Sequence, residues 1–300
     1  MQKTSKSLNK HNSNFNIIKL VILIFILNIN SINAENKIFY IGSGSPNAIF
    51  YPIAHSLCKN FNSKQHEYHC IAKVSKGAAD NLKNLHNNEI EFGISQASLY
   101  KDFYNSKNYT NIIPILGLHK ESFSILVNRD SNIKSLKDLK NKNVNIGNIG
   151  SGSRVYYEKI SKIIGLDKSE FSQIYEEKSG DISSLLCSKK IDAAIYLVGH
   201  PNKIFQTSIE ECNSKLIGLN FFERYRITKH LPEFVTSKLK NDIYESKEKS
   251  IKTVSIPIIL STNTEVSDDL VTKFISISKE SLPDLKQENK IFNEINFELP

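Results

Sequence analysis

The stretch KIFYIGSGSPN, residues 37–47, decides the fold. Its first five residues are mostly β-branched or aromatic, which predicts a strand, and the Gly-, Ser- and Pro-rich residues after them end that strand. A helix is predicted next, over 48–61. The stretch NVNIGNIGSGSR, residues 143–154, has the same order of strand, glycine-rich turn and helix start. Two such units predict an α/β protein.

The alternation of strands and helices continues outward from both stretches. Around the first, strands are predicted over 68–74 and 92–95 and a helix over 79–88, which implies βαβ units and a parallel sheet. Around the second, the pattern predicts strands over 143–147, 173–177, 193–198 and 215–219, and helices over 154–165 and 182–188.

Two apolar, β-rich segments, 122–127 and 254–260, bracket the second block, and an amphipathic helix is predicted over 267–282. We therefore expect two lobes. Lobe I comprises 35–125 plus 255–300, and lobe II, 126–254, is inserted into it and joined to it by the two bracketing strands.

The N-terminus has the three parts of a signal peptide. Residues 1–19 carry four lysines and no acid, Leu20 to Ile29 is apolar except for Asn28, and Ala34 supplies a small residue at the cleavage point. The alternative is an uncleaved anchor, but a spanning helix needs about 20 apolar residues. No Cys directly follows the apolar segment, so a lipid anchor is not expected. We predict cleavage near Ala34 and a periplasmic protein that does not insert into the membrane.

Net charge excludes one class of function. The whole chain is +8, and removing residues 1–34 leaves 35 basic and 31 acidic residues, or +4. These charges are scattered and form no basic stripe interleaved with aromatics, so a nucleic-acid partner is not expected. A mild positive field modestly favours an anionic ligand.

Four cysteines, Cys58, Cys70, Cys187 and Cys212, suggest disulfides in an exported chain. Three pairings are possible, and the local one, Cys58–Cys70 and Cys187–Cys212, closes two short loops worth roughly 3 kcal/mol each. A metal site around residues 66–70 is the alternative, but no Cys-x-x-Cys spacing supports it. No metal or cofactor is expected.

The two glycine-rich turns are the main candidate site. Glycine lets the backbone approach a ligand, and a helix N-terminus favours an anion. Neither turn has the Gly-Lys-Ser/Thr of a phosphate loop or the glycine order of a dinucleotide site. The candidate residues are Ser43, Gly44 and Asn47 in the first turn, and Asn148, Gly150, Ser151, Gly152, Ser153 and Arg154 in the second.

Other strand ends supply further polar residues. In an open α/β sheet, ligands bind beyond the carboxyl ends of the strands. By that rule the candidates are Ser75, Gly77, Asn81, Gln96, Tyr196 and His200. For each alone, capping or turn formation is the plainer interpretation. An enzyme would need a nucleophile, a base and an orienting group. Ser151 with His200 is the one pair to consider, and it lacks the Gly-x-Ser-x-Gly elbow, so we expect no enzyme.

Several motifs in order resemble the TAXI-type solute receptors, the extracytoplasmic subunits of one branch of TRAP transporters. The matching segments are Gly42-Ser43-Gly44 with Tyr51-Pro52, then residues 75–81, Gln96, residues 145–154 and residues 196–202, and the family also has cysteines at the four positions seen here. Departures from the family pattern stand at Ala78, Ala97, Ser98 and Ile149.

The resemblance implies a two-lobed periplasmic-binding-protein fold of type II, in which each lobe has a mostly parallel sheet with helices on both faces and a ligand cleft lies between the lobes. It implies a receptor that closes on a small carboxylate (an acidic amino acid such as glutamate, glutamine, a 2-oxo acid or a dicarboxylate) and delivers it to a TRAP-type permease. Both turns would hold the carboxylate. Tyr51, Gln96, Asn148 and Tyr196 would shape the rest, and His200 either contacts the ligand or ends its strand. The alternatives are a sensor module with the same fold, or a serine hydrolase.

Overall fold

The computed structural model describes residues 36–46, 49–106, 109–149, 151–240, 243–244 and 250–300. Residues 1–37 and 38–300 form two separate units, and the fold is that of the second. The predicted signal peptide, residues 1–34, lies outside the described residues. Among the helices that are described, none combines the length and the apolar composition needed to cross a bilayer.

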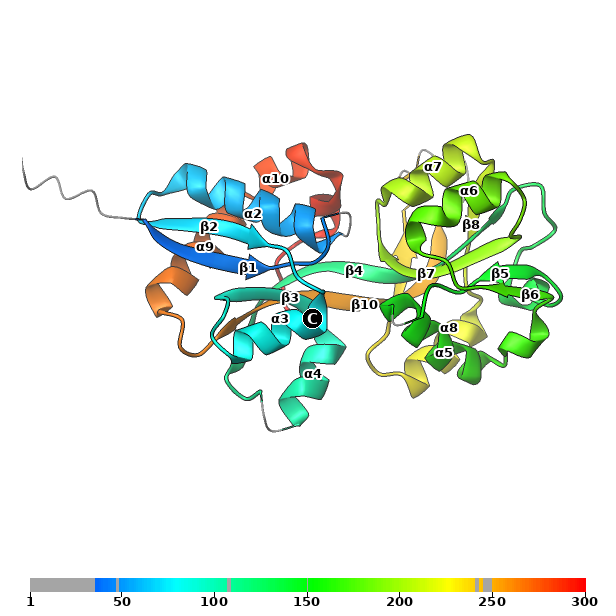
Figure 1. Cartoon of the computed structure of the whole chain (residues 1–300), viewed down its shortest axis with the longest axis horizontal. Helices are drawn as coiled ribbons and strands as arrows, with labels where there is room; N and C mark the ends of the chain where they lie inside the picture. The colour runs from blue at the N-terminus through cyan, green and yellow to red at the C-terminus, as the bar shows by residue number, and fades with distance from the viewer. Residues whose placement is uncertain (1–35, 47–48, 107–108, 150, 241–242, 245–249) are drawn as a thin grey trace, which may run out of the picture. The chain divides into compact units, whose positions relative to one another are not determined.

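One mixed sheet organises the chain (Figure 1). Its strands follow the order β2-β1-β3-β10-β4-β7-β5-β6, with β8 paired to β4 and β9 paired to β10. The strands are β1 (Lys37–Gly42), β2 (Tyr68–Lys73), β3 (Phe92–Gln96), β4 (Ile112–Asn128), β5 (Asn143–Asn145), β6 (Gln173–Tyr175), β7 (Ala193–Gly199), β8 (Ser214–Ile217), β9 (Val235–Leu239) and β10 (Ile251–Asn263). The α/β prediction is confirmed.

The predicted parallel pairing is present on both sides of the two long strands. β1 pairs with β3, and β5 pairs with both β6 and β7, in parallel. β4 and β10 pair antiparallel with each other and with β3, β7, β8 and β9. The sheet is therefore mixed because two long strands of opposite direction run through its middle.

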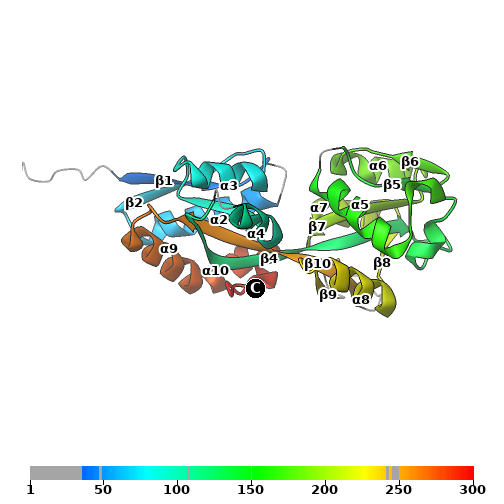
Figure 2. The same ribbon diagram turned by 90° about the horizontal axis from the view of Figure 1, so that it is seen from below.

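Helices cover both faces of the sheet (Figures 1 and 2). α2 (Phe50–Lys64), α9 (Asp268–Glu280) and α10 (Leu282–Glu288) pack on one face of β1 to β3, and α3 (Ala78–His86) and α4 (Ala97–Asn105) pack on the other. We call these cores the first core region. In the second core region, α5 (Gly152–Ile164) and α8 (Phe221–His230) cover one face, and α6 (Ile182–Cys187) and α7 (Lys203–Glu211) cover the other. Four short 3-10 helices complete the described elements: Leu136–Leu139, Lys168–Glu170, Ser179–Asp181 and Lys290–Glu294.

The strands β4 and β10 belong to both core regions. Each strand contributes apolar side chains to both core regions, from two successive stretches of its length. β4 passes from the first region to the second, and β10 passes from the second to the first. On β4 these are Leu116 and Leu118, then Phe123 and Ile125; on β10 they are Val254 and Ile256, then Ile258 and Leu260. Between the two stretches the strands stay paired, with Ser122 opposite Ser255, Glu121 opposite Ile256 and Lys120 opposite Pro257. We call this segment, residues 119–122 with 255–257, the crossover.

Both predicted local disulfides are present. Cys58 of α2 joins Cys70 of β2, with a Cα–Cα distance of 4.9 Å, and Cys187 at the end of α6 joins Cys212, which ends α7, at 4.5 Å. Because Cys70 is oxidised, it cannot serve as a metal-binding thiolate with His66 and His69. Each disulfide fastens neighbouring elements within one core region.

We predict that removing either disulfide destabilises the protein. The pairs are 12 and 25 residues apart. Loop-closure entropy then gives about 3 kcal/mol for each, and slightly more for the longer loop. Urea denaturation of Cys58→Ser/Cys70→Ser and of Cys187→Ser/Cys212→Ser measures the loss, with the reduced unmodified protein for comparison. Unfolding midpoints that do not move in either variant would contradict the prediction.

Candidate functional site

Residues predicted to bind ligand tie together the ends of β1, β2 and β3. The backbone N–H and the hydroxyl of Ser43, which is buried, both donate to the carbonyl of Lys73, at 3.0 and 2.7 Å. The buried amide of Asn81 donates from Nδ2 to the carbonyls of Ser43 and Ile94, at 2.7 and 2.8 Å. These donors are used within the protein, so Ser43 and Asn81 fix the shape of this edge of the sheet.

The turn after β2 is also built from predicted residues. Ser75 donates its hydroxyl to the carbonyl of Ser43 at 3.1 Å and accepts the N–H of Gly77 at 3.0 Å. Gly77 has φ +107°, which an L side chain rarely adopts, so this turn requires glycine. Gly44 is buried, Tyr51 is half-buried and stacked on His55, and Asn47 lies outside the described residues.

The second glycine-rich turn positions α5 against β7. Ser151 accepts the N–H of Arg154 at 3.2 Å as the N-cap and donates to the carbonyl of Asn148 at 2.8 Å. The hydroxyl of Ser153 bonds both backbone groups of Leu197 at 3.1 Å. Gly152 is the exposed first residue of the helix, the half-buried Asn148 bonds only weakly to the next carbonyl, and Gly150 is outside the described residues.

Arg154 is already paired with two carboxylates. Its guanidinium contacts Glu158 at 2.8 Å and Glu176 at 2.6 Å, and it is 6% exposed. Hydrogen bonds from Arg154 and Lys168 lower the pKa of Glu158 to about 2. Arg154 was a candidate ligand-binding residue in the sequence. In the structure its positive charge is balanced by these two acids.

Tyr196 and His200 are buried in internal networks. Tyr196 donates its hydroxyl to the carbonyl of Glu177 at 2.7 Å and accepts from Asn145 at 3.2 Å. His200 bonds Ser124 through Nε2 at 2.7 Å and the Tyr244 hydroxyl through Nδ1. Burial lowers the pKa of His200 to about 3, so the ring is neutral. Ser151 and His200 have separate partners and form no catalytic pair.

A polar cluster that the sequence only partly revealed lies where the core regions meet. Gln96, at the end of β3, donates from Nε2 to Oε2 of Glu121 at 3.1 Å. Ser98, in the first turn of α4, shares a hydrogen bond of 3.0 Å with the hydroxyl of Tyr156 on α5. The first bond joins β3 to the crossover, and the second joins the first core region directly to the second.

Burial has changed the acidity of this cluster. Desolvation raises the pKa of Glu121 to about 7, although the hydrogen bond from Gln96 acts in the opposite direction. Desolvation also raises the pKa of Tyr156, and the charge of Glu121 contributes to that rise. Glu121 was not a predicted site residue, although it is the acid at the centre of the crossover.

The core regions also touch beside Gly199, the residue opposite Glu121 on β7. A Cβ at this position would lie 2.5 Å from Cδ1 of Ile49 and 2.8 Å from Cδ2 of His119. Glycine is therefore required for this close approach. His119 is buried, neither ring nitrogen has a hydrogen-bond partner among the described residues, and burial lowers its pKa to about 3.

Comparison with known families shows which protein family this chain belongs to. The model of the NMT1-like family matches residues 41–299, nearly the whole described fold. The chain belongs to the NMT1-like family.

Solved structures similar to this NMT1-like chain share its fold at low identity. A probable amino-acid ABC transporter extracellular-binding protein from Bacillus subtilis has a TM-score of 0.54 and 15% identity, over 84% of this chain and 96% of that one. The periplasmic aliphatic sulphonate binding protein from Escherichia coli has a TM-score of 0.52 and 12% identity, over 86% of this chain and 78% of that one. A putative L-cystine ABC transporter protein from Listeria monocytogenes has a TM-score of 0.51 and 15% identity, over 87% of this chain and 98% of that one.

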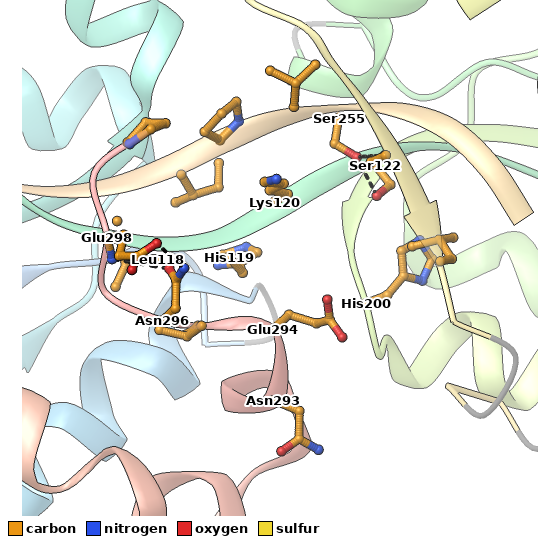
Figure 3. A pocket seen from close by; sticks show the side chains of 18 of the residues that line it. Leu118, His119, Lys120, Ser122, His200, Ser255, Asn293, Glu294, Asn296 and Glu298 are labelled. Carbon is orange, nitrogen blue, oxygen red and sulfur yellow. Dashed lines mark hydrogen bonds between the residues drawn. The ribbon is translucent and has the colours of Figure 1, made fainter. Parts of the chain in front are cut away.

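A separate cavity of about 740 Å³ in this NMT1-like protein is lined by β4, β9, β10 and the C-terminal residues (Figure 3). Ser122, bonded to Ser255 at 2.8 Å, lines it. The neighbouring Glu121 is not among the residues that line it. Lys120, Lys238 and Lys286 line the cavity together with Glu294 and Glu298. Charges of both signs leave this cavity without a clear preference for one class of ligand.

We predict that Glu121→Gln stabilises the unliganded protein at alkaline pH. The pKa of Glu121 rises from 4.5 to about 7 on folding, so the folded state retains a proton that the unfolded chain releases. That contribution is present below pH 4.5 and is lost as pH rises through 7. Glutamine avoids the loss, and the expected gain at pH 8 over pH 5 is roughly 1–2 kcal/mol after allowing for partial exposure.

Urea denaturation of both proteins at pH 5 and pH 8 measures this gain. The buried histidines are the same in both proteins, so their own pH dependence cancels in the difference. A change in stability of equal size at the two pH values would show that the Glu121 carboxyl has an ordinary pKa.

Proposed function

We propose that this protein is an extracytoplasmic solute-binding receptor. It would capture a small carboxylate by closure of two lobes, 35–125 with 255–300 and 126–254, and deliver it to a membrane permease. The observation that carries the proposal is the crossover, where two long strands connect two core regions. Beside it, the helices α4 and α5 of these two regions touch through the hydrogen bond between Ser98 and Tyr156. The fold shared with extracellular and periplasmic binding proteins supports it.

Helix N-termini at these strand ends support a carboxylate ligand. Neither α2 nor α3 has a side-chain hydrogen bond at its N-cap, so their first N–H groups are not capped by the protein's own side chains. The partial positive charge of a helix N-terminus stabilises an anion. The resemblance to TAXI receptors adds the candidate ligands, which are acidic amino acids, glutamine, 2-oxo acids and dicarboxylates.

The permease would be part of a small-molecule importer. The motif order that resembles TAXI receptors favours a TRAP-type permease, whereas the structural neighbours are named for ABC transporters. Both systems use a receptor outside the cytoplasmic membrane, which agrees with the predicted signal peptide and the two disulfides.

We predict that at least one of these carboxylates stabilises residues 35–300 against heating. A ligand at a hundredfold excess over its Kd adds about 2.7 kcal/mol. For a chain of this size that raises the Tm by roughly 5 °C or more. A thermal-shift screen at millimolar ligand measures it, with the methyl ester of each compound as the control. No shift with any of the acids would count against a carboxylate receptor.

We also predict that the exported protein begins at Glu35. Expression of the full chain in a bacterial host, osmotic release of the periplasm and N-terminal sequencing would show the cleavage point. A protein that stays in the membrane fraction with Met1 retained would instead indicate an anchor.

A further inference from the structure

Glu121 occupies a position where the two hydrophobic cores meet. It lies on β4 between Leu118, in the first core region, and Phe123, in the second. Its cross-strand neighbours are Gly199 on β7 and Ile256 on β10, and neither carries a polar side chain. The carboxyl group therefore sits at the junction of the two core regions, and Glu121 is not one of the residues that line the cavity of about 740 Å³.

The hydrogen-bonding capacity of Glu121 is largely unused. In the part of the chain that the structure describes, Gln96 is its one hydrogen-bond partner, and no Lys, Arg or His forms a salt bridge with it. An ionised carboxylate has about four acceptor positions. A partly buried carboxylate that lacks a cation is costly, and a charged donor from a ligand would remove that cost.

Arg154 and Glu121 differ in whether neighbouring side chains balance their charge. Arg154, a candidate ligand-binding residue in the sequence, is paired with Glu158 and Glu176. Glu121 is the opposite case, since no cation among the residues that the structure describes forms a salt bridge with it. Its neighbours Gln96, Ser98 and Tyr156 are neutral hydrogen-bonding groups from both core regions, as expected around a polar ligand.

We propose that Glu121 binds a cationic amino group of the ligand and makes the receptor select amino acids over the matching 2-oxo acids. This inference rests on the proposed function. The helix N-termini hold the ligand carboxylate, and Glu121 holds its ammonium group. The two ends of the ligand are thus recognised by groups of opposite charge that come from different parts of the chain.

The experiment compares ligands that differ only at the α-carbon. Isothermal titration calorimetry at pH 8 measures the affinities of glutamate and 2-oxoglutarate, of alanine and pyruvate, and of leucine and 4-methyl-2-oxopentanoate. For the unmodified protein we expect the amino acid of the bound pair to have at least tenfold higher affinity than the oxo acid. In Glu121→Gln the ratio should fall below about threefold.

Glu265→Gln is the matched control, because Glu265 is an exposed acid beyond the end of β10. It should keep the full preference. Equal affinity within a pair in the unmodified protein, or a preference that persists in Glu121→Gln, would overturn the inference. If only oxo acids bind, the inference fails while the proposed function stands; if nothing binds, both fail.

A second measurement does not depend on the folding of a variant. With a pKa of about 7 for Glu121, lowering the pH from 8 to 6 should weaken amino-acid binding about tenfold and leave oxo-acid binding equal or stronger. Other titratable groups near the crossover are Tyr156 on α5, whose pKa is raised by burial and by the charges of Glu233, Glu121 and Asp102, and the buried His119 and His200. The histidines stay neutral, since burial lowers the pKa of each to about 3, and the pKa of Tyr156 is raised.

The expected pH dependence therefore belongs to Glu121. An amino-acid affinity that is flat from pH 6 to pH 8 would overturn the proposal even if Glu121→Gln does not fold.

Discussion

The strands β4 and β10 have to serve two hydrophobic cores at once, and the other features of the molecule depend on this constraint. A strand that leaves one core and enters another passes through a stretch where the two cores meet. Residues 119–122 and 255–257 form that stretch, and they are mostly polar. Their backbones remain paired, and the side chain of Ser122 forms a hydrogen bond with that of Ser255, so the polar side chains project from a continuous pair of strands. The crossover is thus the part of the two strands where polar side chains are concentrated.

The local strand–turn–helix units could be predicted from sequence because their signals are local. A strand, a glycine-rich turn and a helix start follow one another within about a dozen residues, and both disulfides join segments close in sequence. The elements that were missed lack such signals. α4 has no fully buried residue. α8 begins with the exposed Phe221 and Phe222, so it shows no clear apolar stripe.

The candidate site was only partly predictable, because the same residue types serve both capping and binding. Ser43, Asn81 and Ser153 provide hydrogen bonds at strand ends, as a ligand site would need, but they give those bonds to the protein's own backbone. One partner of Arg154 was visible in sequence, since Glu158 is four residues away on the same helix face. Glu176 was not visible, because it approaches from the end of β6.

Glu121 could not be identified from its own neighbourhood in the sequence. Its environment is made by β3, β7 and β10, which come from three distant segments of the chain. Burial by distant segments raises its pKa, whereas a short sequence window shows only an acid after a lysine. Long-range pairing, rather than composition, gives this residue its chemistry.

The sign of the charge at the crossover limits which carboxylates can bind there. Two unit negative charges about 6 Å apart repel by roughly 3 kcal/mol at an effective dielectric constant of about 20, which is more than a hundredfold in affinity. An anionic ligand without a cationic group would meet this repulsion whenever Glu121 is ionised. An amino acid offsets it with its own ammonium group, and a protonated Glu121 removes it. The buried Arg154 does not offset this repulsion, because two acids already balance its charge.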